Sequence, residues 1–276
     1  MPKLNRIRAR FIQIQNIKKI TGVMEMIANS KIPKIKRQFK SSQEYFENLD
    51  HIMQNILANL CKTPEELVAS KSEKNLYIVF GSNLGFCGAL NNQILKKITP
   101  NLTKNDEIII FGKKIYNYIS LRYPKNIIKY FPGVEETNFS EPILQVTNLI
   151  NKAISEKKYK NIFICYNKFI NIIQSKPNII NLFDFAKNKT KQEGYGIEFE
   201  PSAVEVLKKL IPFYIKSLLE KIFIESKLVE TSARRTSMES ATDNAQDILQ
   251  KLELEINSSR QSMITQEIIE IISGKM

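Results

Sequence analysis

From Phe213 to Ser273 the chain contains neither glycine nor proline, a run of 61 residues without a strong helix breaker. Helices of globular proteins usually have about 8–20 residues, so one continuous helix over this segment would be a rod rather than a core helix. At a rise of about 1.5 Å per residue it would extend about 90 Å, roughly three diameters of a small domain. A helix of this length needs another element along it to bury an apolar face.

An apolar seam runs along this segment at steps of three and four residues, the spacing of a helix that packs against another helix. Its members are Met238, Ala241, Ala245, Ile248, Leu252, Ile256, Ser259 and Met263. A second seam with the same spacing lies in the N-terminal segment and comprises Leu4, Ile7, Phe11, Ile14, Ile17, Thr21, Met24 and Ala28. The two seams predict an intramolecular antiparallel coiled coil, with two separate dimerising coils as the structural alternative.

The predicted N-terminal helix has two further features, a second apolar stripe and an internal proline. A second apolar stripe widens its apolar face and predicts that the helix is covered on more than one side. This stripe consists of Ile12, Ile20, Val23 and Ile27. Pro33 interrupts the pattern, and a proline inside a helix costs about 3 kcal/mol and usually kinks it. We therefore expect a kink or a short break near residues 29–33.

Between the two helices, short β-rich runs alternate with helical stretches, which is typical of βαβ units and a mostly parallel sheet. The predicted strands are Asn75–Gly81, Glu107–Phe111 and Asn161–Tyr166, and the predicted helices are Ala89–Ile98, Lys113–Arg122 and Glu141–Glu156. A further strand within Asn171–Phe183 is expected to return antiparallel. The fold class is therefore α/β: N- and C-terminal helices at residues 1–60 and 203–276 form a long antiparallel coiled coil, and residues 73–200 form a Rossmann-like domain.

The net charge of +13 is concentrated near the N-terminus. Residues 1–40 contain eleven Lys or Arg and one acid, Glu25, whereas residues 201–276 contain ten basic and eleven acidic residues. Such a basic segment indicates an acidic partner, either nucleic acid, anionic lipid or protein, unless it is only a solvated face. The main alternative function is a basic coiled-coil nucleic-acid-binding protein. Only Phe11 and Phe39 could stack on bases within the segment, which argues against single-strand binding.

Few residues suggest catalysis or metal binding. The three cysteines, Cys61, Cys87 and Cys165, are far apart and are expected to be reduced, buried thiols. With His51 as the single histidine and no CxxC pair, neither a Cys/His zinc site nor a Ser-His-Asp site is expected. The acid pairs Asp106/Glu107 and Glu135/Glu136 have nothing around them in the sequence that predicts a perturbed pKa.

The glycine-rich run Gly81–Gly88 follows a predicted strand and precedes a predicted helix, the usual position of a phosphate-binding loop. Its spacing is GxxxGxxG and no P-loop lysine follows it, so a tight strand-to-helix turn is the plainer explanation. A nucleotide-dependent enzyme is therefore only a third possibility. The chain is predicted to be mechanical or interactive, with no catalytic residue, cofactor or metal.

Three blocks of the sequence together resemble the gamma subunit of F-type ATP synthases over nearly the whole chain. The first block comprises Arg6–Arg8 and Asn16–Ala28, and the second is Gly85–Asn91. The third comprises Arg235–Met238, Ala241–Ala245 and Asn257–Gly274, within which Ile264–Glu270 looks like the C-terminal signature of the family. All three occur in the family order and at the matching ends of the predicted architecture.

This resemblance implies a non-catalytic rotor subunit. In the family the terminal helices form a shaft inside a hexamer of alternating alpha and beta subunits, and the α/β domain lies against the epsilon subunit and the membrane c-ring; the delta subunit belongs to the same complex. Proton flow turns the ring and the shaft, which drives the catalytic beta subunits through their cycle of ATP synthesis. The implied location is peripheral, on the cytoplasmic side of a bacterial plasma (inner) membrane, with no targeting segment and no nucleic-acid partner.

The resemblance also implies contact residues for the alpha and beta subunits. The polar contacts to beta-subunit loops match Arg260, Gln261, Thr265 and Glu267, and the methionine near the acidic beta lever loop matches Met24. The complementary positive charge would come from Arg8, Arg10, Lys18 and Lys19. The apolar tip that turns in a sleeve of the hexamer would comprise Ile264, Ile268, Ile271 and Ile272.

Overall fold

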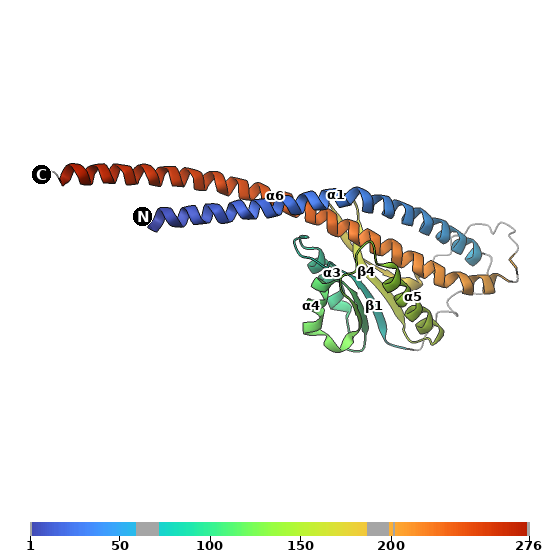
Figure 1. Cartoon of the computed structure of the whole chain (residues 1–276). Coiled ribbons are helices and arrows are strands. Elements are labelled where there is room, and N and C mark those ends of the chain that lie inside the picture. Colours follow the sequence, from blue (N-terminus) through green and yellow to red (C-terminus); the bar gives the residue numbers. More distant parts are fainter. Residues whose placement is uncertain (1, 59–71, 187–198, 201, 275–276) are drawn as a thin grey trace. The chain divides into compact units, whose positions relative to one another are not determined.

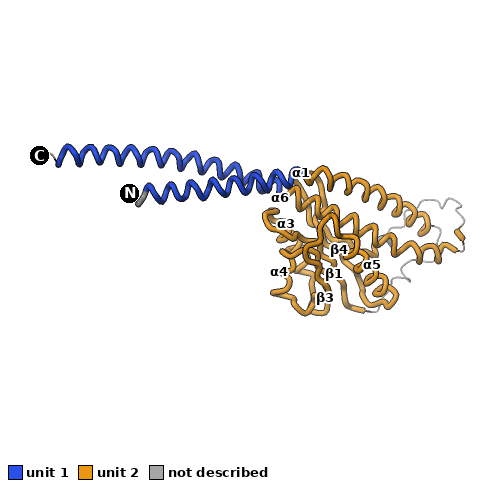
Figure 2. The backbone as a smooth tube through the Cα atoms, viewed as in Figure 1, with its two compact units in different colours: residues 1–30, 234–276 blue, residues 31–233 orange. Residues whose placement is uncertain are grey.

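A computed structural model describes residues 2–58, 72–186, 199–200 and 202–274 of the chain (Figure 1). Two long helices, α1 (Pro2–Ala58) and α6 (Ala203–Ser273), lie at the two ends of the sequence. The chain divides into a coiled-coil unit, residues 1–30 with 234–276, and an α/β unit, residues 31–233 (Figure 2). Each unit contains part of both helices, and each is described separately below.

The α/β unit is built on a five-stranded sheet with the order β3-β2-β1-β4-β5. Its strands are β1 (Asn75–Phe80), β2 (Glu107–Phe111), β3 (Ile127–Phe131), β4 (Asn161–Phe169) and β5 (Ser175–Asn181). The first four strands run parallel, and β5 pairs antiparallel with β4. These features confirm the predicted α/β fold with a mostly parallel sheet.

Helices cover both faces of this sheet, which explains why the central strands are apolar along their whole length. The helices between the strands are α3 (Leu90–Ile98), α4 (Lys113–Arg122) and α5 (Ser140–Ser155), with short 3₁₀ turns at Thr99–Asn101, Pro124–Asn126 and Leu182–Ala186. One face packs against α5 and the α/β-unit parts of α1 and α6, and the other face packs against α3 and α4. Consecutive residues of β1, such as Ile78 and Val79, therefore lie in different cores, on opposite faces of the sheet.

The predicted strands and helices agree with the structure to within a few residues, with two corrections. Strand β3 was not predicted, although its sequence Ile-Ile-Lys-Tyr-Phe has strand character and lies between Pro124 and Pro132. It is one of the two edge strands of the sheet, and its partial burial leaves a weaker apolar pattern than that of β1 or β2. The predicted strand within Asn171–Phe183 is shorter, because residues 171–174 form the turn before β5.

Helix α1 continues through Pro33, so the short break allowed by the sequence is absent. The side-chain Nε of Arg37 donates a hydrogen bond to the Pro33 carbonyl oxygen at 3.4 Å. Ile32 and Ile35, on either side of the proline, are buried against the sheet. Packing of these neighbours offsets the loss of one helical hydrogen bond at the proline. The domain limits 1–60, 73–200 and 203–276 remain predictions.

Candidate subunit-contact surface

The coiled-coil unit contains two helical segments that run antiparallel. The ammonium group of Lys18 donates a hydrogen bond to Oε1 of Gln246, and the hydroxyl oxygens of Thr21 and Thr242 lie 2.8 Å apart. From Lys18 to Thr21 along α1, the partner in α6 changes from Gln246 back to Thr242, so the two segments run in opposite directions. This pairing confirms the predicted intramolecular coiled coil.

Most residues of the two predicted seams are buried or half-buried between these segments. The buried positions of the unit, among the described residues, are Leu4, Thr21, Ala28, Met238, Ala245, Leu249 and Leu252. Two of them, Ala28 and Ala245, have small side chains, which lets helix backbones approach closely. The seam differs from the prediction at Ile17, which is 47% exposed, and at Leu249, which is buried although it was not included.

The residues matched to partner contacts all belong to the coiled-coil unit, and most of them point to solvent. The exposed ones are Arg8, Arg10, Lys19, Arg260, Gln261, Thr265, Glu267 and Ile268, while Lys18 and Met24 are half-buried. The Thr265 hydroxyl donates to the backbone carbonyl oxygen of Gln261 at 2.9 Å. The structure thus brings these residues onto two neighbouring helical surfaces rather than into a pocket.

Large apolar side chains accompany these polar residues on the surface of the unit. The second stripe of α1 is exposed, with relative exposures of 57% for Ile12, 61% for Ile20, 55% for Val23 and 52% for Ile27. The end of α6 exposes Ile264, Ile268, Ile269, Ile271 and Ile272. Contiguous exposed apolar surface of this kind marks interaction sites in soluble proteins. The predicted second cover over α1 is thus absent among the described residues of this chain.

The glycine-rich loop after β1 is closed by its own contacts. The Ser82 amide donates to Oδ1 of Asn91 at 3.1 Å, and Nδ2 of Asn91 returns a bond to the Ser82 hydroxyl at 2.7 Å. Gly112 has a φ of +107°, and a Cβ there would lie 2.4 Å from the carbonyl oxygen of Gly81. The space between this loop and α6 is only about 10 Å³, about enough for a single water molecule. These contacts support a tight turn at this position, and the space between the loop and α6 is too small for a nucleotide.

Two residues of this loop are contact candidates that the sequence reasoning did not select. Leu84 is 58% exposed and Phe86 is 66% exposed. Phe86 also has a φ of +59°, a left-handed conformation that is costly for a bulky residue. Backbone strain that presents an aromatic ring to solvent indicates a functional constraint. The glycines on both sides made the loop recognisable, but only the structure shows that its apolar side chains point outward.

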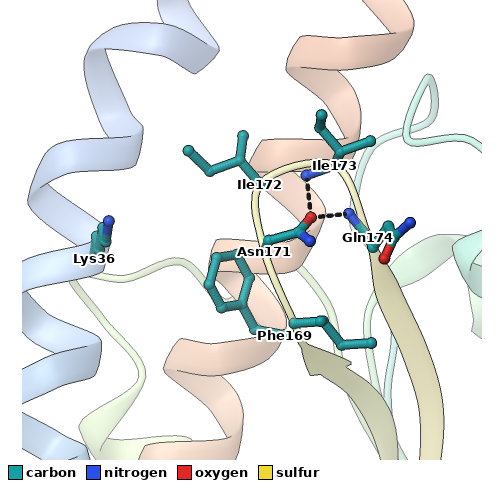
Figure 3. A pocket seen from close by; sticks show the side chains of 7 residues that line it. Lys36, Phe169, Asn171, Ile172, Ile173 and Gln174 are labelled. Atoms are coloured by element: carbon teal, nitrogen blue, oxygen red, sulfur yellow. Dashed lines mark hydrogen bonds between the residues drawn. The ribbon is translucent and has the colours of Figure 1, made fainter.

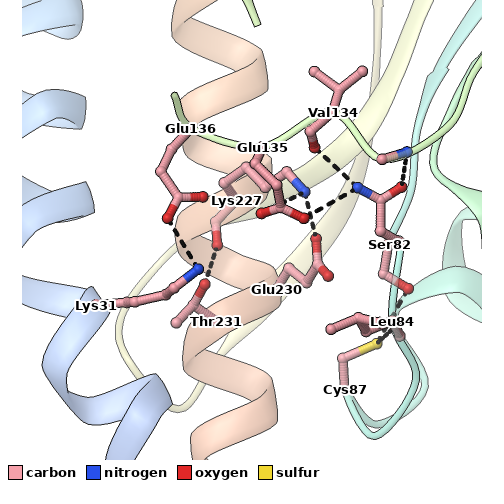
Figure 4. Close-up of polar contacts among 12 residues, drawn as sticks. Lys31, Ser82, Leu84, Cys87, Val134, Glu135, Glu136, Lys227, Glu230 and Thr231 are labelled. Atoms are coloured by element: carbon pink, nitrogen blue, oxygen red, sulfur yellow. Dashed lines mark hydrogen bonds and ion pairs between the residues drawn. The ribbon is translucent and has the colours of Figure 1, made fainter. Parts of the chain in front are cut away.

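A buried polar cluster ties the loop after β3 to α6 and α1 within the α/β unit (Figure 4). Lys227 is 6% exposed, and its Nζ lies 3.3 Å from a carboxylate oxygen of Glu230 and 3.8 Å from one of Glu135. Lys31 of α1 pairs with Glu136 at 3.2 Å. Burial acts to raise the pKa of Glu136, but a backbone hydrogen bond and Lys31 outweigh it, so that this pKa lies below the usual value.

A second ion pair involves Glu107 at the start of β2. Its carboxylate accepts hydrogen bonds from Nζ of Lys158 at 2.8 Å and from the Tyr159 hydroxyl at 2.5 Å. Burial again acts to raise the pKa of Glu107, but these two donors lower it below the usual value. Nothing in the sequence predicted a perturbed pKa in the pairs Asp106/Glu107 and Glu135/Glu136. That expectation is wrong for Glu107 and Glu136. The partners responsible are remote in sequence or belong to a different element, so no local pattern could reveal them.

The remaining candidate groups have structural environments. Cys87 and Cys165 are buried thiols, and burial raises the pKa of the Cys165 thiol well above its usual range. Cys61 lies outside the described residues. His51 is exposed on α1, and its Nδ1 lies 3.1 Å from Nδ2 of Asn55. Within the described part of the chain, no helix is both long enough and apolar enough to cross a membrane.

Comparisons with known proteins agree over the full length of the chain. Residues 3–276 match the family described as ATP synthase. The chain is similar to the ATP synthase gamma chain of Mycoplasmopsis pulmonis, with 35% identity over 100% of both chains. It is also similar to the ATP synthase gamma chain of Rickettsia typhi, with 32% identity over 99% of both chains.

Solved structures show a similar fold at low sequence identity. One similar chain comes from a structure of OSCP, F1 and c-ring of the Euglena gracilis mitochondrial ATP synthase. It superposes with a TM-score of 0.72 at 17% identity, and the match covers 99% of this chain and 94% of that chain. A chain of the Tetrahymena thermophila mitochondrial ATP synthase central stalk and c-ring gives a TM-score of 0.64 at 19% identity, covering 80% of this chain and 99% of that chain.

Proposed function

Because the chain belongs to the ATP synthase gamma-chain family, we propose that it is the central-stalk rotor subunit of an F-type ATP synthase. In this role it couples proton-driven rotation of the c-ring to the conformational cycle of the catalytic beta subunits. It contributes no catalytic residue itself, and the chemistry of ATP synthesis takes place in the beta subunits. Its other partners are the alpha, epsilon and delta subunits and the membrane c-ring.

The observation that carries this proposal is the antiparallel helix pair with an uncovered apolar stripe beside basic side chains. A pair of helices joined by a continuous seam resists bending better than one helix. Its surface is asymmetric, because basic residues outnumber acidic ones in residues 1–30, whereas acidic residues outnumber basic ones in residues 234–274. Such a surface makes different contacts with a surrounding hexamer at each angle, and a partner that contacts two states differently shifts the balance between them.

The proposed residue roles are those that the family resemblance implies, and most of these residues are exposed in the coiled-coil unit. Arg260, Gln261, Thr265 and Glu267 contact beta-subunit loops, and Met24 lies close to the acidic beta lever loop. Positive charge opposite that loop comes from Arg8, Arg10, Lys18 and Lys19, which favours orientation and association rate more than affinity. Ile268 and its apolar neighbours at the end of α6 turn inside an apolar sleeve of the hexamer. The complex holds the chain at the cytoplasmic side of the bacterial inner membrane as a peripheral subunit.

Co-purification from intact membranes tests this function. We expect an affinity-tagged chain to recover alpha and beta subunits in the proportion of one chain to one hexamer, together with ATP hydrolysis activity. The purified chain alone is expected to hydrolyse no ATP. Recovery as a free monomer, or as a complex with nucleic acid that dissociates steeply with salt, would contradict the proposal.

A further inference from the structure

The turn between β4 and β5, in the α/β unit, is closed by hydrogen bonds among its own residues. Oδ1 of Asn171 accepts hydrogen bonds from the backbone amides of Ile173 at 3.0 Å and Gln174 at 2.7 Å (Figure 3). The amides of Ile170 and Asn171 donate to the Gln174 carbonyl oxygen at 3.2 and 3.1 Å. Four hydrogen bonds within five residues fix the conformation of the turn, so its side chains are held in defined positions.

The side chains that this turn presents are unusual for their position. Turns favour Gly, Pro, Asn, Asp and Ser, whereas this one contains three isoleucines. Ile173 is 81% exposed, Ile170 is 55% exposed and Ile172 is 36% exposed. A residue choice that contradicts local turn chemistry without a gain inside the fold is typical of a functional site. The exposed isoleucines therefore point to a contact outside this chain.

The base of the turn is anchored to the helices that cover the sheet. The Phe169 amide donates a 2.9 Å hydrogen bond to Oε1 of Glu225, a buried residue of α6. The Phe169 ring packs edge-to-face against Phe39 of α1, with ring centroids 6.3 Å apart. These two contacts join the base of the turn to both long helices. A partner that docks on the turn would thus be mechanically connected to α1 and α6.

Beside the turn lies a hollow of about 470 Å³ that is lined by Lys36 of α1 and by residues 169–174. Lys36 is the only charged residue among these, so the hollow combines an apolar wall with one positive charge. Lys34, Arg37 and Lys40 are exposed on the same part of α1 and add to the positive potential. Of these neighbours, Lys40 has a carboxylate close by, that of Glu44 at 3.8 Å.

We propose that this surface, formed by Lys36 and residues 169–174, is a docking site for an acidic amphipathic segment of another subunit of the same complex. Leucine-like side chains of that segment bury Ile172 and Ile173, and its carboxylates face Lys36. An apolar centre with a charged rim is the usual composition of a protein interface. Lipid headgroups and nucleic acid would use the lysines but leave the isoleucines uncovered. The proposal rests on the proposed function, because it requires the assembled complex.

Photocrosslinking in the purified complex tests the docking site. A photoreactive phenylalanine analogue replaces Ile173, and mass spectrometry identifies the linked peptide. We expect a peptide from another subunit that contains both carboxylates and large apolar residues. Because surface charge pairs contribute up to about 1 kcal/mol, Lys36→Glu is expected to lower the yield of this adduct about fivefold.

The same analogue at Leu121, which is 84% exposed on α4, is the matched control, and its adducts should not respond to Lys36→Glu. Adducts at residue 173 that stay within the chain or join lipid, or a yield that Lys36→Glu leaves unchanged, would overturn the docking site. The alpha and beta content of the same preparation reports separately on the proposed function. If those subunits co-purify and the adduct is absent, only the docking site is wrong.

Discussion

At the scale of single residues, Lys227 is the side chain on which the polar cluster of the α/β unit depends. It is buried with Glu230 at 3.3 Å and Glu135 at 3.8 Å. Lys227→Met keeps the length of the side chain but removes the charge opposite two carboxylates. Breaking a buried pair by removing one partner usually costs about 3–5 kcal/mol. We expect a loss of about 3 kcal/mol in the free energy of unfolding, measured by urea denaturation.

Two comparisons test whether the loss of stability in Lys227→Met comes from the carboxylates that it leaves without a partner. Adding Glu230→Leu to Lys227→Met should recover part of the loss, because the second change removes an uncompensated carboxylate. Lys152→Met removes an exposed partner of Glu156 at 3.8 Å and should change the free energy of unfolding by less than about 1 kcal/mol. If Lys152→Met and Lys227→Met had equal effects, the cluster would have no special role in stability.

Arg260 and Gln261 are exposed on α6, so their side chains contribute little to packing within the described part of the chain. We expect Arg260→Ala with Gln261→Ala to lower coupled ATP synthesis in membrane vesicles severalfold. Thermal unfolding of the purified chain should not change, because exposed substitutions usually alter stability by less than about 0.5 kcal/mol. Lys251→Ala, also exposed on α6, is the control. Normal synthesis by the double variant would refute the contact roles.

At the scale of secondary-structure elements, Glu225 joins α6 to the end of β4. Burial raises the pKa of its carboxyl group, while the Phe169 amide and then Lys221 and Lys168 act in the opposite direction. The folded chain thus holds this proton more tightly than the unfolded chain, in which glutamate has a pKa of about 4.3. Stability from this group is fully present below that pKa and falls as the pH rises through the folded value.

Two substitutions of Glu225 separate its charge from its hydrogen bond. Glu225→Gln keeps an acceptor for the Phe169 amide and removes the buried charge, so it should not destabilise the chain at pH 7 and should flatten the decline of stability above about pH 4. Glu225→Ala leaves that amide without its acceptor and should cost about 1–3 kcal/mol. Urea denaturation of both variants across the pH range measures the difference. Equal destabilisation by Gln and Ala would show that packing, not the hydrogen bond, is what matters.

The elements differ in how well the sequence predicts them, for physical reasons. Strands β1 and β2 are buried on both faces, so their apolar runs are continuous and their limits are visible in the sequence. Edge strand β3 has an exposed face, and its mixed pattern concealed it. Local chemistry predicted a kink or a short break near residues 29–33, but α1 is continuous there, with Ile32 and Ile35 packed on the sheet.

At the scale of the whole molecule, the spacing of apolar residues predicted which faces of α1 and α6 pack together. It did not predict which side chains stay exposed once the helices are packed. The seams of α1 and α6 follow from spacing, because one helix surface must cover the other. Lys227 with Glu135, Lys31 with Glu136, and the outward position of Phe86 depend on which segments the fold brings together. The residues expected to contact partners lie mostly on the exposed surface, where sequence patterns constrain side chains least.

The exposed stripe on α1 gives the last prediction, which concerns the chain alone and in its complex. Ile20 is 61% exposed and Ile27 is 52% exposed. Burying an isoleucine side chain contributes about 1.5–3 kcal/mol, so Ile20→Ser with Ile27→Ser should weaken assembly with the alpha and beta subunits at least about tenfold. The same variant should reduce self-association of the isolated chain, because it shortens an uncovered apolar surface.

Sedimentation of the isolated chain and titration of assembly measure these two effects. Leu121→Ser, at an exposed apolar position in the α/β unit, is the control and should leave assembly unchanged. Because Ile20 and Ile27 lie outside the seam between α1 and α6, the double variant should keep its helical signal and its unfolding temperature. Full assembly by that variant would mean that the stripe stays uncovered in the complex and that the second cover predicted for α1 does not exist.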